Sequence, residues 1–227
     1  MISDLISVIR GDMTPLAFFI QLGAIIFVVF CATPIHEYAH ALIATKLGDE
    51  TPRAMGRLTI RPLAHIDPIG ALMIFLFGFG YAKPVQVRMA RFKNPKRDMA
   101  LVALAGPVSN LLQAFVCSFV CSACYFGAMK LENIALLYIS EFFIFAATIN
   151  INLAVFNFLP IPPLDGSRLV TALLPARIYY KIMQYERYIQ IALFVLLFTG
   201  VLSKPLSIVS GFLVEAFVKI TSLPFGL

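Results

Sequence analysis

Six apolar segments make up most of this 227-residue chain and constrain its fold more than any other feature. Hydrophobic residues are 60% of the sequence and charged residues 13%, whereas soluble domains are typically about half apolar and a quarter charged. Apolar runs of this kind are typical of chains that fold inside a lipid bilayer. We therefore expect an all-α membrane protein, a polytopic helical bundle of about five to six transmembrane segments. The apolar segments cover residues 15–44, 68–81, 99–129, 134–159, 188–202 and 206–223 of one membrane-embedded domain, residues 1–227.

The second apolar segment, residues 68–81, has about 14 residues and contains three glycines. It is too short for an ordinary spanning helix of about 20 residues. The loops on either side, residues 46–61 and 83–97, are both basic, and basic loops face the cytoplasm. The segment should therefore enter and leave on one side, as a re-entrant element covered by protein. The residues RLTI at positions 57–60 predict a strand, so we expect a small re-entrant β-hairpin here.

The net charge of +6 does not indicate a nucleic-acid partner. The basic residues lie in short loops between apolar segments, where they follow the positive-inside rule rather than forming a basic groove. We expect contact with the lipid bilayer and none with nucleic acid. The sequence leaves the oligomeric state open.

The segment HEYAH, residues 36–40, lies near the end of the first apolar segment. His36 and His40 are four residues apart, so on a helix they project from the same face. Two neutral imidazoles placed in this way can bind zinc, and Glu37 can act on a water molecule as general base. Ionisable residues at bilayer depth are costly and usually functional, which favours a metal site over a simple helix end at the interface.

A hydrolytic zinc site needs a third protein ligand and one open coordination position. Asp165 is the best candidate, because three nearby prolines hold its loop extended and two intervening segments return the chain to the side of His40. The alternative is that Asp165 caps the helix that begins near Ser167. We expect one Zn²⁺ per chain, bound by His36, His40 and Asp165.

Three separated blocks of sequence give the chain a family resemblance: HEYAH, AGPVSN at residues 105–110, and NFLPIPPLDG at residues 157–166. With these blocks it resembles the site-2 protease family of intramembrane zinc metalloproteases. The stretches GRLTIRPLAHIDPIG and GYAKPV are similar to the compact bacterial branch, which lacks PDZ and CBS domains. The resemblance covers about residues 15–170, the expected catalytic core, and leaves about residues 186–223 as accessory helices.

The resemblance implies roles for individual residues. It implies zinc binding by the two histidines of HEYAH and by Asp165, with Glu37 as the catalytic base. It also implies that Asn157 is catalytic, by holding the substrate backbone or the oxyanion. Asn110 matches a further family position in the neighbouring helix, whose role in substrate contact or gating is left open. For both asparagines the alternative is an interhelical hydrogen bond, which membrane bundles use freely.

Two polar residues precede the short apolar segment and have open roles. His65 could approach the metal to gate water or occupy the open coordination position, or it could only shape the turn into the segment. For Asp67 we favour a structural role, as the cap of a helix that has Pro68 at its first position.

The expected activity is hydrolysis of peptide bonds within or next to transmembrane segments of membrane-protein or membrane-peptide substrates. A zinc-bound water would be the nucleophile and Glu37 the general base. The site should face the cytoplasm from an integral cell membrane, the bacterial inner membrane, beside the β-hairpin. A zinc transporter is one alternative, but residues 188–223 offer almost no ligands for a transport path. A catalytically silent scaffold is the other, but the set of ligands and base is intact.

Overall fold

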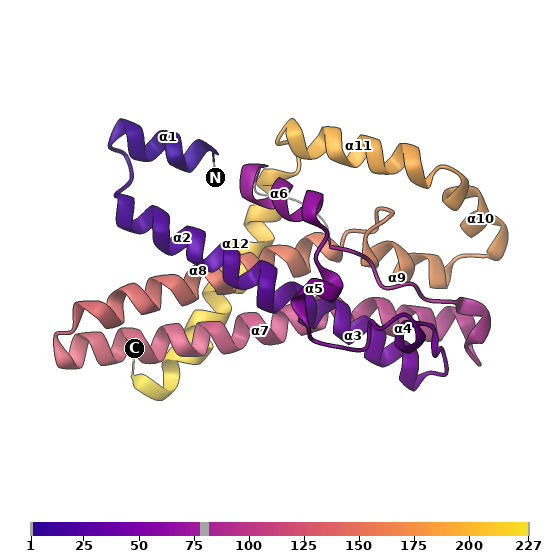
Figure 1. Ribbon diagram of the computed structural model, residues 1–227, viewed down its shortest axis with the longest axis horizontal. Helices are drawn as coiled ribbons and strands as arrows, with labels where there is room; N and C mark the ends of the chain where they lie inside the picture. Colours follow the sequence, from indigo (N-terminus) through magenta and orange to yellow (C-terminus); the bar gives the residue numbers. More distant parts are fainter. Residues whose placement is uncertain (1, 78–81, 227) are drawn as a thin grey trace.

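The computed structural model describes residues 2–77 and 82–226, and every regular element within these two ranges is helical (Figure 1). The elements are α1 (Ile2–Arg10), α2 (Pro15–Phe27), η1 (Val28–Ala32), α3 (Thr33–Lys46), α4 (Thr51–Ala54), α5 (Pro62–His65), α6 (Pro68–Phe77), η2 (Met89–Arg91), α7 (Pro95–Leu131), α8 (Ile134–Asn157), α9 (Asp165–Leu173), α10 (Ala176–Gln184), α11 (Glu186–Phe198), α12 (Ser203–Ser222) and η3 (Leu223–Phe225).

Four helical stretches of the described chain are long and apolar enough to cross a membrane. They contain 32, 37, 24 and 23 residues, in the order Pro15–Lys46, Pro95–Leu131, Ile134–Asn157 and Ser203–Phe225. Helices α6 and α11 have 10 and 13 residues, fewer than the roughly 20 that a spanning helix needs. The expected helical membrane fold is confirmed, whereas the count of five to six spans stays a prediction.

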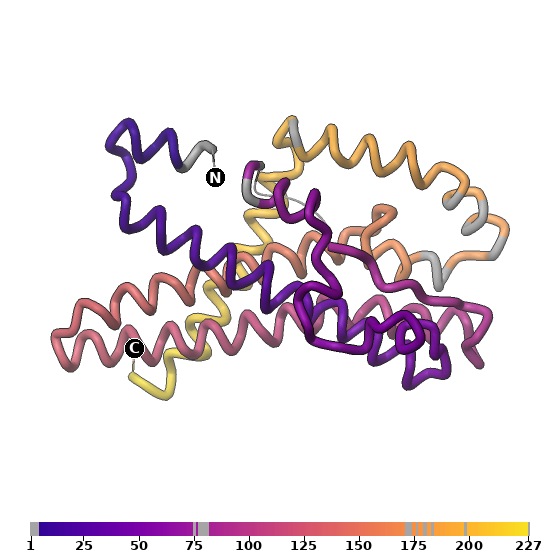
Figure 2. Tube along the Cα trace, viewed as in Figure 1, coloured from indigo at the N-terminus to yellow at the C-terminus, as the bar shows by residue number. Residues whose placement is uncertain are grey.

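The first spanning stretch is continuous through α2, η1 and α3, although it contains Pro34 (Figure 2). A proline inside an α-helix has no N–H to donate, and its ring clashes with the carbonyl four residues earlier. Here the turn before it, Val28–Ala32, is a π-helix, and the Thr33 hydroxyl donates to the Val28 carbonyl at 3.2 Å. The wider turn accommodates the proline without ending the helix.

The antiparallel pair α7 and α8 forms the centre of the bundle (Figure 1). Glu132, with φ of 49°, ends α7, and the Asn133 side chain caps α8 by accepting from Ala135 N at 2.9 Å. Helix α2 packs on α8 through small, fully buried residues such as Ala24 and Ala147, which let the two backbones approach closely. On the other side, α12 crosses both helices.

The chain between α5 and α7 makes an excursion that returns to its starting point. Lys83 N donates to the His65 carbonyl at 2.8 Å, so the chain beyond α6 comes back to the end of α5. The predicted β-hairpin is not confirmed: within the described ranges residues 58–59 form a bend and residues 82–88 are extended without a strand partner. Side chains of Arg57 and His65 bond to backbone carbonyls there instead. The expected tip, including Gly78, Gly80 and Tyr81, lies outside the described residues.

The two basic loops lie at the same end of the bundle. Phe92, in the loop that follows α6, is 5% exposed and packs with Ala44 near the end of α3 and with Val102 near the start of α7. The loop after α3 begins at this same end, and the turn between α7 and α8 lies at the opposite end of the long helices (Figure 1).

This arrangement predicts the result of cysteine labelling in sealed vesicles. In a variant whose four native cysteines are replaced by alanine, a cysteine at the exposed positions Met55 or Lys93 should react from one side of the membrane. A cysteine in place of the exposed Leu131 should react only from the other side. Labelling of positions 55 and 93 from opposite sides would contradict the excursion described above.

Candidate metal centre

Helix α3 places the two histidines of HEYAH on one buried face. Each residue is 8% exposed, and their Nε2 atoms lie 3.1 Å apart. The Nδ1 atom of His40 lies 2.7 Å from the carbonyl oxygen of Val102 on α7. Because a carbonyl can only accept, Nδ1 carries the proton and the Nε2 lone pair is free. This second interaction fixes the ring orientation in the manner typical of metal-binding histidines.

Asp165, the first residue of α9, completes a group of three possible ligands. Its Oδ2 lies 3.3 Å from the Nε2 atoms of both His36 and His40. Ligand atoms about 2.0–2.2 Å from a tetrahedral zinc stand roughly 3.3–3.5 Å from each other, so the observed spacing fits that ion. A carboxylate binds a metal ion in its ionised form, and the imidazole nitrogens that face the ion must be unprotonated.

Two glycines allow these three side chains to meet. At Gly106 on α7, an added Cβ would lie 2.3 Å from His40 Nε2 and 2.6 Å from His36 Nε2. At Gly166, it would lie 2.3 Å from the carbonyl oxygen of Phe158. Neither position has room for any side chain, so the approach of α7 to α3 and the turn that carries Asp165 both require glycine.

Glu37 lies beside this group and is 8% exposed. Its Oε2 accepts a hydrogen bond from Val85 N at 3.2 Å, so the extended segment 82–88 passes directly over the carboxylate. The bond orients Glu37 without giving it a charged partner. A carboxylate in this setting can accept a proton from water at the metal group.

Asp49 fixes the far end of that extended segment. It is fully buried, and its carboxylate accepts from Arg88 N at 2.6 Å, from Thr51 N at 3.0 Å and from the Thr51 hydroxyl. Burial raises the pKa of Asp49, but these hydrogen bonds and the nearby Arg91 lower it more, so its net pKa is below the ordinary value. The segment is thus held at Lys83, Val85 and Arg88 by bonds to three separate parts of the chain.

The two asparagines named from the family resemblance lie at different depths. Asn157 is the last residue of α8 and is half-buried, and its Nδ2 donates to the Leu153 carbonyl at 3.0 Å. That bond leaves its side-chain oxygen available. Asn110, on α7, is 1% exposed, and its Oδ1 has no hydrogen-bond partner among the described residues. Their roles toward substrate stay predictions.

His65 and Asp67 make local contacts. His65 is fully buried, and its Nε2 donates to the Thr59 carbonyl at 2.7 Å, so its ring stabilises the loop before α6. A gating role for His65 stays a prediction, and among the described residues His65 is not part of the metal-binding group of His36, His40 and Asp165. Asp67 Oδ1 accepts from Ile69 N at 3.0 Å and Gly70 N at 2.9 Å, which confirms it as the cap of α6.

Sequence reasoning did not identify Gly106, Asp49 or Arg57. Gly106 lies inside the AGPVSN block, but its need for space appears only when α7 is placed against α3. Asp49 precedes Thr51 by two residues, and an aspartate often accepts a hydrogen bond from the backbone N–H two residues later. This local pattern could have identified Asp49 from the sequence. The buried Arg57 donates to the carbonyls of Ala64 and Lys83, and the second is 26 residues away, a contact that no local pattern predicts.

Gly106→Ala should weaken zinc binding at least about tenfold, because the added methyl group displaces both imidazoles. Metal content of the purified protein and competition with a chelator would measure the loss. Gly211→Ala is the matched control, since a Cβ at Gly211 meets no atom within 4 Å. Equal zinc affinity in the two variants would contradict the packing described above.

Asp49→Asn should lower the melting temperature near pH 7 and change its dependence on pH. Because the folded-state pKa of Asp49 is depressed, its stabilisation is fully present above the unfolded value near 3.9 and is lost as pH falls through the folded value. The difference in melting temperature between wild type and variant should therefore narrow below about pH 4. Glu50→Gln, at the exposed neighbour, is the control, and a difference that stays constant down to pH 3 would contradict the assignment.

Comparisons with known proteins agree with this geometry. The sequence model described as "Peptidase family M50" matches residues 123–202, which include Asp165. YwhC of Bacillus subtilis (strain 168), named as a candidate zinc metalloprotease, is 40% identical over 165 residues, 73% of this chain and 75% of its own. No solved structure matched the chain.

More distant relatives carry names of the same kind. Rip2 of Mycolicibacterium smegmatis is 30% identical over 139 residues, 58% of this chain and half of its own length. MJ0611 of Methanocaldococcus jannaschii is 31% identical over 137 residues, 60% of this chain and 62% of its own. Both are named as candidate zinc metalloproteases. The resemblance seen in the sequence is confirmed. The protein is a zinc-dependent metalloprotease, and its apolar helices embed it in the membrane. The chain belongs to peptidase family M50, the site-2 proteases.

Proposed function

We propose that this protein hydrolyses peptide bonds within or next to the transmembrane segments of membrane-protein substrates. The observation that carries the proposal is the group of three ligand atoms 3.1–3.3 Å apart, two of them on a helix long enough to span the membrane. A donor set of two imidazoles and one carboxylate is typical of catalytic zinc, because it leaves a coordination position open. Catalysis at this depth requires a substrate that lies in the bilayer.

His36, His40 and Asp165 would hold the zinc ion. Zinc bound there supplies a Lewis acid that lowers the pKa of a water molecule to roughly 7. Glu37 would act as general base toward the attacking water and would return the proton to the leaving amine. The Val85 N–H holds the Glu37 carboxylate in place for both transfers. Asn157, at the end of α8, would stabilise the negative charge that develops on the substrate carbonyl oxygen.

A helical substrate must unwind before it can be cut, because its carbonyls are occupied by its own hydrogen bonds. We infer that the extended segment 82–88 receives the unwound stretch by edge pairing, as a strand would. The segment is suited to this because the bonds at Val85 and Arg88 hold it rigid above Glu37. Asn110 and His65 would contribute to substrate contact or to gating of the site.

We further infer that the site faces the cytoplasm of a bacterial inner membrane. The basic loops at residues 46–61 and 83–97 lie at the metal end of the bundle, and basic loops are retained on the cytoplasmic side. Helix α6 would then be re-entrant, because the chain around it returns to its starting point. Residues 1–227 would form one membrane-embedded protease domain with a core of about residues 15–170.

Two other functions are less well supported. A zinc transporter needs a succession of ligand sites, but the described residues contain one group of His, Cys, Asp and Glu side chains that could hold a metal. A silent scaffold has no need for a general base, but Glu37 is present and held beside the metal group by Val85.

Glu37→Gln should retain zinc but reduce cleavage at least about 100-fold, the contribution typical of a general base. Cleavage would be measured on a panel of single-pass membrane proteins reconstituted with the enzyme, with and without a zinc chelator. Glu132→Gln, at the opposite end of α7, is the matched control. Cleavage by Glu37→Gln at the wild-type rate would rule out the assigned base, whereas zinc uptake into sealed vesicles without cleavage would favour a transporter.

A further inference from the structure

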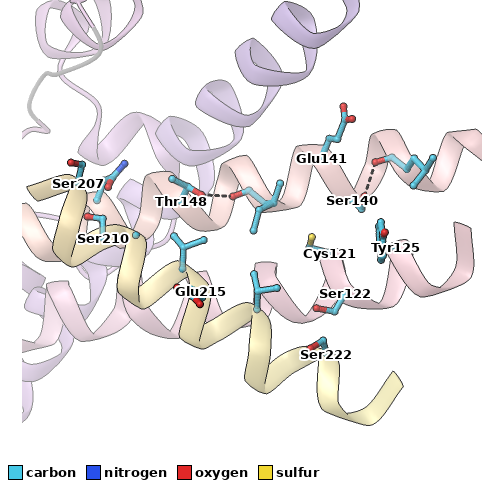
Figure 3. A pocket seen from close by; sticks show the side chains of 16 residues that line it. Cys121, Ser122, Tyr125, Ser140, Glu141, Thr148, Ser207, Ser210, Glu215 and Ser222 are labelled. Carbon is cyan, nitrogen blue, oxygen red and sulfur yellow. Dashed lines mark hydrogen bonds between the residues drawn. The ribbon is translucent and has the colours of Figure 1, made fainter. Parts of the chain in front are cut away.

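A cavity of about 950 Å³ lies between α7, α8 and α12, away from the metal group (Figure 3). It runs from Leu137 to Asn152 on α8 and from Ser207 to Ser222 on α12. At about 1.5 Å per residue, each of these stretches is roughly 22 Å long. The cavity is therefore an elongated groove that follows two spanning helices, and its length exceeds that of a compact small-molecule pocket.

The α12 side of the groove is open enough for another helix backbone. Ser207 and Gly211 are four residues apart and both line it. A Cβ at Gly211 would meet no atom within 4 Å, so the space beside it is unfilled. Small residues at this spacing let two helices approach closely in a membrane, where close packing drives association.

Two polar side chains of α12 line the groove without partners. Ser210 is 3% exposed, and its hydroxyl has no hydrogen-bond partner among the described residues. Glu215 is exposed, and no ion pair among the described residues includes it. About 18 Å of α12 precedes Glu215 and about 10 Å follows it, so it lies well inside the hydrocarbon. Ionisable groups at that depth are rare and are normally paired.

We propose that this groove docks the transmembrane helix of a partner membrane protein that carries a Lys or Arg at the depth of Glu215. The carboxylate would pair with the basic side chain, Ser210 would bond to a polar group of the same helix, and Gly211 would allow close backbone contact. This inference rests on the membrane fold alone and does not depend on the proposed catalytic roles.

Other occupants fit the groove less well. A lipid acyl chain is long enough, but it offers nothing to Glu215 or to the Ser210 hydroxyl, whereas the Ser140 and Thr148 hydroxyls across the groove already donate to the Leu137 and Ile144 carbonyls within α8. A second copy of this chain fits less well, because the basic residues of its four candidate spans lie at span ends or, for Lys219, one helical turn away from the depth of Glu215. These residues are Lys46, Lys96, Arg97, Lys130, Lys204 and Lys219.

The test uses a synthetic leucine-alanine transmembrane peptide with one central lysine, and a second peptide with leucine at that position. Each carries a photoreactive group one helical turn from the centre and is reconstituted with the full-length protein in phosphatidylcholine vesicles. The lysine peptide should cross-link about tenfold more efficiently than the leucine peptide, at residues of α8 and α12 mapped by mass spectrometry. Equal yields for the two peptides would overturn the proposal, as would cross-links that map elsewhere.

Three variants separate the contributions to docking. Glu215→Gln should remove the preference for lysine, and Gly211→Leu, which fills the open space beside α12, should abolish cross-linking of both peptides. Glu186→Gln, an exposed carboxylate at the start of α11 outside the groove, should change nothing. Zinc content and gel-filtration behaviour establish that each variant is folded. A lysine preference that survives in Glu215→Gln would overturn the proposal, and so would displacement of the peptide by self-association of the protein through α12.

Discussion

The close approach of three ligand atoms inside an apolar bundle is the constraint on which the rest of this structure depends. The atoms lie 3.1–3.3 Å apart, and they come from α3 and from the start of α9, which is more than 100 residues later in the chain. Helix α7 can pass beside them because Gly106 has no side chain, and the chain can turn into α9 because Gly166 has none. The two glycines therefore determine how closely α3, α7 and α9 can approach one another.

The excursion between α5 and α7 solves a second problem, the placement of irregular backbone next to a site at bilayer depth. Such backbone is tolerated only where protein or a wet cavity satisfies its polar groups. In this chain the backbone polar groups form hydrogen bonds with buried side chains at separate points, including Arg57, His65 and Asp49, rather than with the backbone of a neighbouring strand. One of these points, Val85 N, bonds to Glu37. The element that shapes access to the site also orients the catalytic base proposed above.

The helices and the metal group could be predicted from the sequence because each has a local signal. Apolar length marks the spans: residues 134–159 were expected to form a helix, and the structure has Ile134–Asn157. The i, i+4 spacing of His36 and His40 likewise fixes their shared face. The β-hairpin was not confirmed because RLTI has strand-like composition, while its conformation is set by contacts from distant parts of the chain, such as the bond from His65 to Thr59. Gly106 and the groove beside α12 also depend on how helices pack, which no local pattern encodes.

The π-helical turn at Val28–Ala32 has a consequence for the evolution of the family fold. A π-turn adds one residue to a helix, and one residue corresponds to about 100° of rotation about the helix axis. The turn therefore sets the angular register between the part of the span that packs on α8 and the part that carries His36 and His40. Deleting a single residue there would leave both halves helical and equally apolar, but it would turn the histidines away from Asp165. A change that leaves hydropathy and length almost unaltered could thus convert a member of this family into a protein without a metal centre.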